Sequence, residues 1–476
     1  MTANFQFADQ LDVAGKTVLL RLDVNVPLAD GVVSDDTRIR RVMPGVQSLL
    51  VRGAKVVVLT HFGRPKGAFV PALTVRPVAQ SMAGILGQPV PVESDVIGRG
   101  GKKAVAALAG GDILMMENLR FYPEEEANDL AFAKSLAALG DLYVGDAFSC
   151  AHRAHASVDA LPRLMPSAAG RSFAAELAAL DAALSSPVRP LGAVVGGAKV
   201  SSKLALLENL VTQVDGLVLG GGMANTFLLA KGKPIGASLA EPDMVDTARR
   251  IMDGAAAHNC QILLPQDVVV AGEFKLGAAH RLVSSDDVAD GEMILDAGAE
   301  SVAAAMAFLD RCSTIVWNGP MGAFEIPPFD AATTALARAV AAKTQNDGLM
   351  SVAGGGDTMA ALANAGVNDQ FSYVSTAGGA FLEWLEGKRL PGSRRCVSTS
   401  HYAQKTFGYR TVSHKIFGYG AGLDCHKGQA SCFSIIRLNR VCQMSMKHWP
   451  VAARQFLLAA IMRCLARPLP VLCRRG

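Results

Sequence analysis

Short apolar runs alternate with helical patterns through most of this chain, and that alternation limits the fold more than any other feature. The first series of apolar runs is rich in Val, Leu and Ile and lies at residues 16–25, 54–61, 112–121 and 142–148. Helical patterns separate these runs at residues 36–52, 74–86 and 124–139. Strands that alternate with helices are typical of a parallel sheet covered by helices on both faces.

A second series of the same kind follows a helical segment. Ser172 is expected to cap a helix that runs to Leu184, with apolar side chains on one face at Phe173, Leu177, Leu180 and Leu184. Further apolar runs lie at residues 191–197, 216–220, 261–270, 314–317, 349–353 and 372–375. We therefore predict an α/β fold of two doubly wound, Rossmann-like parallel-sheet domains joined by a hinge helix, at residues 1–170, 187–375 and 171–186 respectively.

The composition changes abruptly after Gly392. Residues 1–392 hold 32 Lys and Arg against 41 Asp and Glu, a net charge of −9, whereas residues 393–476 hold 14 against one, a net charge of +13. Three widely spaced cysteines in the first part fit a reducing cytosol, and the last 84 residues hold the other six. We predict a basic, cysteine-rich extension of unknown structure at residues 393–476.

Three hypotheses for this extension stay open. The abrupt change in composition favours a shifted or extended reading frame. The positive charge fits an appendage that binds nucleic acid or acidic partners. The third hypothesis is a zinc site formed by Cys425, His426, Cys432 and Cys442.

No membrane or secretion signal is evident. Residues 1–12 carry acids and no apolar signal core. No run reaches the roughly 20 apolar residues that a membrane span needs. We therefore expect a soluble, cytoplasmic protein without a membrane partner.

Arginine or histidine occurs at or just beyond each of the first four strand ends, where ligands of such sheets bind. The side chains are Arg21, His61, Arg64, Arg120, His152, Arg153 and His155, with Arg38 at the start of the first helix. The planar guanidinium group matches carboxylate and phosphate oxygens two at a time. This set predicts a site for a small anion of several charges, although we assign Arg21 mostly to a structural ion pair with Asp23.

Glycine-rich turns follow apolar strands in the second half, at residues 196–197, 220–222 and 354–356. Glycine lets the backbone approach a ligand, and the helix that follows offers free N–H groups to phosphate. There is no P-loop motif, and no G-x-G-x-x-G turn follows the first strand of either half, which argues against a dehydrogenase. Phosphate contacts are therefore expected from these turns and from Lys199 and Lys203, which lie four residues apart on one helix face or its first turn.

Two acidic residues accompany the glycine-rich turns. Asp357 follows the last turn and is a candidate ligand for a metal ion that bridges phosphates. Glu325 is either a partner for ribose hydroxyls or an exposed loop acid.

Eight stretches resemble those of phosphoglycerate kinases and follow the same order. They lie at residues 21–27, 61–65, 117–121, 146–155, 196–203, 220–225, 317–325 and 354–358. The resemblance covers residues 1 to about 392 and implies reversible phosphoryl transfer from 1,3-bisphosphoglycerate to ADP, which gives 3-phosphoglycerate and ATP, with Mg²⁺ on the nucleotide. It also implies a monomer that closes about its hinge for in-line transfer, with residues 376–392 returning to the first domain.

The resemblance also implies a role for each residue of these stretches. Those expected to bind the glycerate substrate are Asp23, Asn25, Arg38, His61, Phe62, Gly63, Arg64, Arg120 and Arg153. Those expected to bind the nucleotide are Gly197, Ala198, Lys203, Gly221, Gly222, Asn318, Pro320, Glu325, Gly354, Gly355, Gly356, Asp357 and Thr358, with Asp357 toward the metal ion. Those expected to stabilise the transferring phosphoryl group are Arg38, Lys199, Lys203, Gly378 and Gly379.

One departure and one alternative remain. Ala377 stands where the family usually has glycine, and it would cost about 1 kcal/mol if that position needs a positive φ. The alternative to an enzyme is a non-catalytic ligand-binding protein whose extension blocks domain closure.

Overall fold

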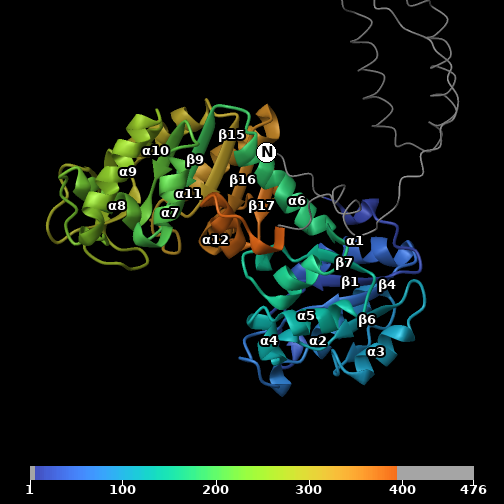
Figure 1. The fold of residues 1–476 in the computed structure, drawn as a ribbon. Helices are drawn as coiled ribbons and strands as arrows, with labels where there is room; N and C mark the ends of the chain where they lie inside the picture. The colour runs from blue at the N-terminus through green and yellow to red at the C-terminus, as the bar shows by residue number, and fades with distance from the viewer. Residues whose placement is uncertain (1–5, 394–476) are drawn as a thin grey trace, which may run out of the picture. The chain divides into compact units, whose positions relative to one another are not determined.

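The computed structural model describes residues 6–393, and two six-stranded parallel sheets form its framework (Figure 1). The first sheet has the strand order β5-β6-β4-β1-β7-β8. All of its neighbouring strands are parallel. Its strands are β1 (Thr17–Leu22), β4 (Lys55–Leu59), β5 (Val92–Glu93), β6 (Ile113–Met116), β7 (Leu142–Asp146) and β8 (Ser167–Ala169).

Helices cover both faces of the first sheet. On one face, α1 (Thr37–Val51) and α2 (Arg76–Leu86) pack against alternate side chains of β1. On the other face, α3 (Arg99–Ala106) and α5 (Leu130–Ala137) belong to the apolar cluster that contains Leu19 of that strand. Because both faces of the sheet are buried, the strands are continuous apolar runs in the sequence.

Local details of the first half differ from the prediction. The expected helix at residues 124–139 is two helices, α4 (Pro123–Glu126) and α5, because Asn128 between them has a left-handed φ of 55°. The expected strands end too late, since the chain leaves each strand early to form a loop. A short hairpin of β2 (Leu28–Ala29) and β3 (Val32–Val33) follows β1 and was not expected.

The second sheet repeats the pattern with the order β11-β10-β9-β15-β16-β17. Its neighbouring strands are all parallel. The strands are β9 (Leu191–Val195), β10 (Gly216–Leu219), β11 (Gln261–Leu263), β15 (Thr314–Asn318), β16 (Met350–Gly354) and β17 (Tyr373–Ser375). The predicted α/β fold with two doubly wound parallel sheets is confirmed.

Helices also cover both faces of the second sheet. Those on one face are α7 (Leu204–Leu210), α8 (Gly221–Ala230), α9 (Val245–Ala257) and α13 (Gly378–Leu385). Those on the other face are α10 (Ala299–Leu309), α11 (Ala331–Asp347) and α12 (Gly356–Ala365). The loops that follow the strands are thereby left free to form sites.

The prediction of a single strand at residues 261–270 is wrong. The chain forms β11 and then β12 (Asp267–Ala271), which belongs to a separate antiparallel sheet of order β13-β12-β14. Pro265 lies between the two strands, and proline has no N–H to donate to a strand ladder. The other strands of this small sheet are β13 (His280–Ser284) and β14 (Met293–Ala297).

One helix joins the two sheets, as Figure 1 shows. This helix, α6 (Arg171–Leu180), has Gly170 as its N-cap, so the expectation that Ser172 caps it is wrong. The Asp146 carboxylate at the end of β7 accepts from the Phe173 N–H at 2.8 Å and so satisfies a donor of the first turn. A π-helical turn at Asp181–Ser185 continues α6 toward β9.

A single apolar cluster connects the two halves of the described chain. Phe148 and Phe173 contribute from the first half and from α6, and their rings lie 5.1 Å apart. Leu191 contributes from β9, and Phe381 and Leu385 contribute from α13. The two sheets therefore share a buried core.

Among residues 6–393, no helix is long and apolar enough to cross a membrane. The predictions for the basic extension concern residues outside this range, apart from Ser393. They include the zinc set Cys425, His426, Cys432 and Cys442.

Candidate functional site

The first candidate site lies where the order of the first sheet reverses. β1 is flanked by β4 on one side and β7 on the other, and later strands extend the sheet in both directions. Ligands bind at such reversal points in doubly wound sheets. Asp23 follows β1, and its carboxylate accepts from the Ser149 hydroxyl in the turn after β7. The loops after these two strands therefore meet.

A cavity of about 630 Å³ opens at this point. We call it the arginine cavity. The predicted residues that line it are Asp23, Asn25, Arg38, His61, Gly63, Arg64, Arg120, His152, Arg153, Gly356, Gly378 and Gly379. The structure thus brings together four arginines that lie far apart in the sequence.

Phe62 is the predicted substrate residue that does not line the arginine cavity. Its side chain is buried in the apolar core beneath the sheet. Its backbone is held by Asn118, whose Oδ1 accepts from the Phe62 N–H at 3.0 Å and whose Nδ2 donates to the Phe62 carbonyl at 2.7 Å. Asn118 Oδ1 also accepts from the Arg120 N–H at 3.1 Å. Asn118 lies within the stretch 117–121, but no sequence pattern indicates this positioning role.

Positive charge dominates the arginine cavity. Arg120 is buried, donates to the Gly63 carbonyl at 2.8 Å and pairs with Glu126 at 3.2 Å. Burial and the neighbouring Arg153 lower the pKa of Arg120. Burial also lowers the pKa of His61 well below its usual range, and the cations nearby lower it further. A neutral histidine among guanidinium groups leaves a site that attracts anions.

Arg21 has a structural role, but its partner differs from the prediction. Its guanidinium donates to the Ser157 hydroxyl at 2.8 Å and lies 3.1 Å from His61 Nδ1. Because β1 ends at Leu22, Asp23 turns toward the cavity, where its carboxylate lies 3.4 Å from Arg38. The expected pairing of Arg21 with Asp23 is therefore replaced by one of Arg38 with Asp23.

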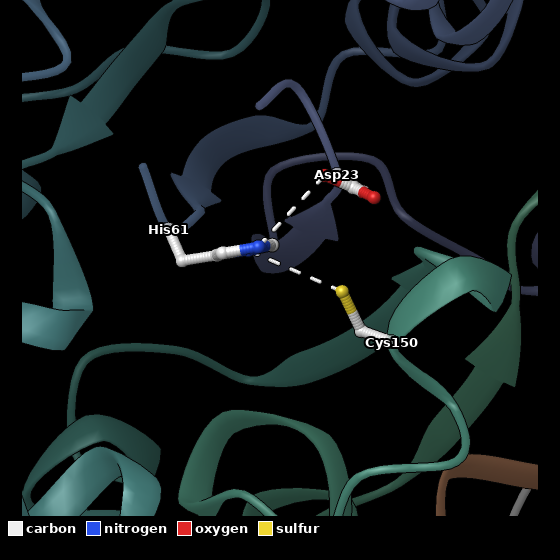
Figure 2. A group of neighbouring side chains, drawn as sticks. All are labelled: Asp23, His61 and Cys150. Atoms are coloured by element: carbon white, nitrogen blue, oxygen red, sulfur yellow. Dashed lines mark hydrogen bonds and ion pairs between the residues drawn. The ribbon is translucent and has the colours of Figure 1, made fainter. Parts of the chain in front are cut away.

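Asp23, His61 and Cys150 form a cluster of potential metal ligands (Figure 2). His61 Nε2 lies 4.0 Å from Asp23 Oδ1, and His61 Nδ1 lies 4.0 Å from the Cys150 sulfur. Burial raises the pKa of the Cys150 thiol, which favours its neutral form, a poor metal ligand. The nearby Arg21 guanidinium also repels a cation, so we assign no metal ion to this cluster.

The second candidate site lies at the corresponding reversal point of the second sheet, between β9 and β15. A cavity of about 510 Å³ opens there, which we call the glycine-turn cavity. The predicted residues that line it are Gly197, Ala198, Gly221, Gly222, Pro320, Glu325 and Asp357. The segments that follow four different strands, β9, β10, β15 and β16, thus converge on one space.

The turn at residues 354–358 is tied to the end of β15. Asn318 Nδ2 donates to the Gly354 carbonyl at 2.7 Å, and Thr358 Oγ1 accepts from the Gly319 N–H at 2.7 Å. Gly355 has a φ of 105°, which favours glycine. Asn318, Gly354 and Thr358 are buried, so they hold the turn in place beneath the cavity.

The two predicted lysines differ in environment. Lys203 Nζ donates to the Gly196 carbonyl at 2.7 Å and to the Asn318 carbonyl at 3.2 Å, so it links the ends of β9 and β15. Burial lowers the pKa of Lys203 to about 8. Lys199 is exposed. Neither lysine is among the residues that line the two cavities.

The start of α12 borders both cavities. Gly356 lines the arginine cavity, and the next residue, Asp357, lines the glycine-turn cavity. Gly378 and Gly379, at the start of α13, lie on the arginine side. Ala377 before them has a φ of −95°, so the strain considered for this alanine does not arise.

Comparison with known proteins agrees with this geometry. The family model described as phosphoglycerate kinase matches residues 8–388. The chain belongs to the phosphoglycerate kinase family. The phosphoglycerate kinase of Rhodospirillum centenum is 58% identical over 388 residues, which are 82% of this chain and 98% of that protein. That of Ruegeria sp. is 57% identical over 384 residues, 81% of this chain and 97% of that protein.

Solved structures of the phosphoglycerate kinase family share the fold. The phosphoglycerate kinase of Coxiella burnetii is 42% identical, with a TM-score of 0.78. The phosphoglycerate kinase of Pyrococcus horikoshii is 30% identical, with a TM-score of 0.68. Each match covers 82% of this chain and 98% of the other. The family resemblance expected from the sequence motifs is therefore confirmed.

Proposed function

We propose that the chain catalyses the phosphoglycerate kinase reaction, the reversible transfer of a phosphoryl group from 1,3-bisphosphoglycerate to ADP. One observation carries the proposal: two consecutive residues, Gly356 and Asp357, line different cavities. One cavity is rich in guanidinium groups and the other in glycine turns, so an acidic substrate and a nucleotide would meet at the start of α12. Phosphoryl transfer depends on such positioning and on charge neutralisation.

The arginine cavity is the proposed site for 3-phosphoglycerate and its acyl phosphate. The proposed ligands are Asp23, Asn25, Arg38, His61, Gly63, Arg64, Arg120 and Arg153, with Phe62 acting through its backbone. The guanidinium groups suit the carboxylate and phosphate oxygens of this substrate. Asp23 and Asn25 are proposed to bind its hydroxyl group.

The glycine-turn cavity is the proposed site for ADP and ATP. The turns at residues 197–198, 221–222 and 354–358 would receive the nucleotide, with Asn318 and Pro320 shaping the loop after β15. Glu325 lines this cavity, which supports a role toward ribose rather than that of an ordinary loop acid. Lys203 is proposed to reach the phosphates.

Magnesium is the proposed metal ion of the nucleotide. Asp357 is exposed in the first turn of α12 and lines the glycine-turn cavity. Mg²⁺ commonly binds to one or two carboxylates together with substrate phosphates and water. The residues present therefore fit this ion, whose charge would offset that of the phosphates.

Transfer is proposed to proceed in line between the two cavities. Arg38, Lys199 and Lys203 would neutralise charge on the moving phosphoryl group, and the N–H groups of Gly378 and Gly379 would donate to its oxygens. Closure of the two domains would exclude water, which otherwise hydrolyses an acyl phosphate.

The proposed domains are those expected from the sequence, at residues 1–170 and 187–375, with the hinge at 171–186. Residues 376–392 are proposed to return to the first domain. The Gly392 N–H donates to the Ala151 carbonyl at 2.9 Å, which supports this return. A cytoplasmic monomer is the proposed state in the cell.

A truncation separates the enzyme from its alternative, a non-catalytic binding protein whose extension blocks closure. A coupled assay should detect ATP formation from 1,3-bisphosphoglycerate and ADP by the full chain and by a version that ends at Gly392. Turnover by both forms supports the proposal. If only the truncated form turned over, the extension would be inhibitory, and if neither did, the proposed activity would be refuted.

We expect the binding of ADP to be coupled to the uptake of a proton by Lys203. Its pKa of about 8 in the free protein means that the ammonium group loses its proton as the pH rises through 8. Bound phosphates would favour the charged form, so ADP binding should take up close to one proton at pH 9 and far less at pH 7. Affinity should fall by up to about tenfold per pH unit above 8.

Calorimetry measures this linkage in two buffers of different ionisation enthalpy. The Lys203→Met variant should bind ADP more weakly and lose the extra proton uptake at pH 9. The same uptake in both proteins would contradict the assignment of this proton to Lys203.

A further inference from the structure

Arg41 connects three parts of the fold that meet behind the arginine cavity. It lies on α1, three residues after Arg38. One guanidinium nitrogen donates to the Thr376 hydroxyl at 2.7 Å, and the other donates to the Tyr373 hydroxyl. The guanidinium carbon also lies 5.6 Å from the centre of the Tyr373 ring. One side chain thus joins a helix of the first sheet to β17 and to the segment that follows it.

A buried carboxylate completes this contact. Glu176 of α6 lies 3.5 Å from Arg41, and its side chain is only 4% exposed. Burial raises the pKa of Glu176, and the Arg41 charge opposes that rise. Removing the guanidinium would leave the buried Glu176 carboxylate without this cation, which is unfavourable. Arg41 thus links α1 to Glu176 of α6 and to Tyr373 of β17.

The contact lies next to the N–H groups that are proposed to donate hydrogen bonds to the transferring phosphoryl group. A cavity of about 50 Å³ lies between Arg38 and the segment Thr376–Ala377, and Arg41 and Glu176 also line it. That segment continues into Gly378 and Gly379, which line the arginine cavity together with Arg38. A shift of Thr376 would therefore move the N–H groups of both glycines relative to Arg38.

Arginine suits this role better than lysine does. Its planar fork donates to Thr376 and Tyr373 through two nitrogens fixed relative to each other. A lysine ammonium group has one nitrogen on a flexible stem, so it does not hold its acceptors in the fixed planar geometry of the guanidinium group.

We propose that Arg41 is a positioning residue for phosphoryl transfer. It holds Thr376 in place, so that the N–H groups of Gly378 and Gly379 face the same phosphoryl group as the Arg38 guanidinium. Arg41 lies behind the arginine cavity and acts through its neighbours. The inference rests on the proposed function, because it assigns these groups to the transferring phosphoryl.

The test compares Arg41→Met with Arg40→Met in the full chain. Arg40 is the next residue of α1 and pairs with Asp36 at 2.7 Å, so its loss is a matched control for charge and helix content. Arg41→Met should lower kcat by about 10- to 100-fold, since a misplacement of about 1 Å has effects of this size. The KM for ADP should stay within about twofold, and Arg40→Met should keep the kcat of the unsubstituted protein.

Two further variants test the geometry. Arg41→Lys should recover little of the lost kcat, because one ammonium group does not replace the fork. The combined Arg41→Met and Tyr373→Phe variant should lose less kcat than the product of the two single losses, since both break the same contact. An unchanged kcat in folded Arg41→Met, or full recovery by Arg41→Lys, would overturn the proposal.

Hydrogen exchange gives a readout that does not depend on turnover. The amides of residues 376–380 should exchange faster in Arg41→Met than in Arg40→Met, while those of β1 stay unchanged. Equal exchange in the two variants would refute the restraint on Thr376 even in a protein that proved inactive. Absence of turnover by the unsubstituted chain would instead refute the proposed function.

Discussion

Replacing Arg38 with alanine is expected to lower kcat by about 100- to 1,000-fold, the range found when one preorganised donor to a transition state is removed. The guanidinium lies 3.4 Å from the Asp23 carboxylate and 3.5 Å from the Asn25 carbonyl, and its side chain is 45% exposed. These long contacts and this exposure leave it free to turn toward a phosphoryl group. The affinity for ADP should stay within about twofold of that of the unsubstituted protein, because Arg38 lines the arginine cavity and not the glycine-turn cavity.

Kinetics and binding together decide this prediction. The kcat of Arg38→Ala is measured in the coupled assay, and the dissociation constant of ADP is measured by calorimetry. Arg40→Ala on the same helix is the control for charge and should keep both values. Equal weakening of turnover and of ADP binding would contradict the role given to Arg38.

The Gly196→Ala substitution is expected to destabilise the protein by about 3 kcal/mol or more, at the upper end of the range for overpacking. A Cβ atom at Gly196 would lie 1.7 Å from the Pro320 carbonyl oxygen, so the backbone after β9 or β15 would have to move. The Lys203 ammonium group donates to the Gly196 carbonyl and would lose its position as well. Loss of stability should therefore be accompanied by loss of ADP binding.

A glycine in open surroundings provides the matched control. Gly84 lies within α2, and a Cβ atom there would meet nothing within 4 Å. Gly84→Ala should stabilise the protein by roughly 0.5–1 kcal/mol, because alanine is the better helix former. Urea unfolding followed by circular dichroism compares the two variants. A Gly196→Ala protein as stable as the unsubstituted chain would contradict the close approach of the two strand ends.

The sequence predicted the fold class well because its signals are local. Continuous apolar runs identify buried parallel strands, and α1 and α2 appeared within two residues of their expected bounds. Two errors arose where a single backbone feature outweighs the pattern. Pro265 divides one apolar run between two sheets, and the left-handed Asn128 divides one helical pattern into two helices.

The candidate site was predictable in its residue types and less so in its contacts. Strand-end arginines and glycine turns could be identified because parallel strands end at one edge of a sheet. The pairing of Arg21 with Ser157 spans 136 residues, and no local pattern indicates it. The same holds for the contact of Arg41 with Thr376, over 335 residues, so this connection had no signal in the sequence.

The apolar cluster shared by the two sheets has a consequence for biosynthesis. Helix α13 supplies Ala380, Phe381 and Leu385 to the core that also contains Leu191 of the second sheet. A chain leaving the ribosome exposes its first residues first, and domains often fold in that order. Here the second half lacks part of its interior until nearly 390 residues have emerged. A nascent chain therefore presents unfinished apolar surface for most of its translation, at the stage when chaperones have access to it.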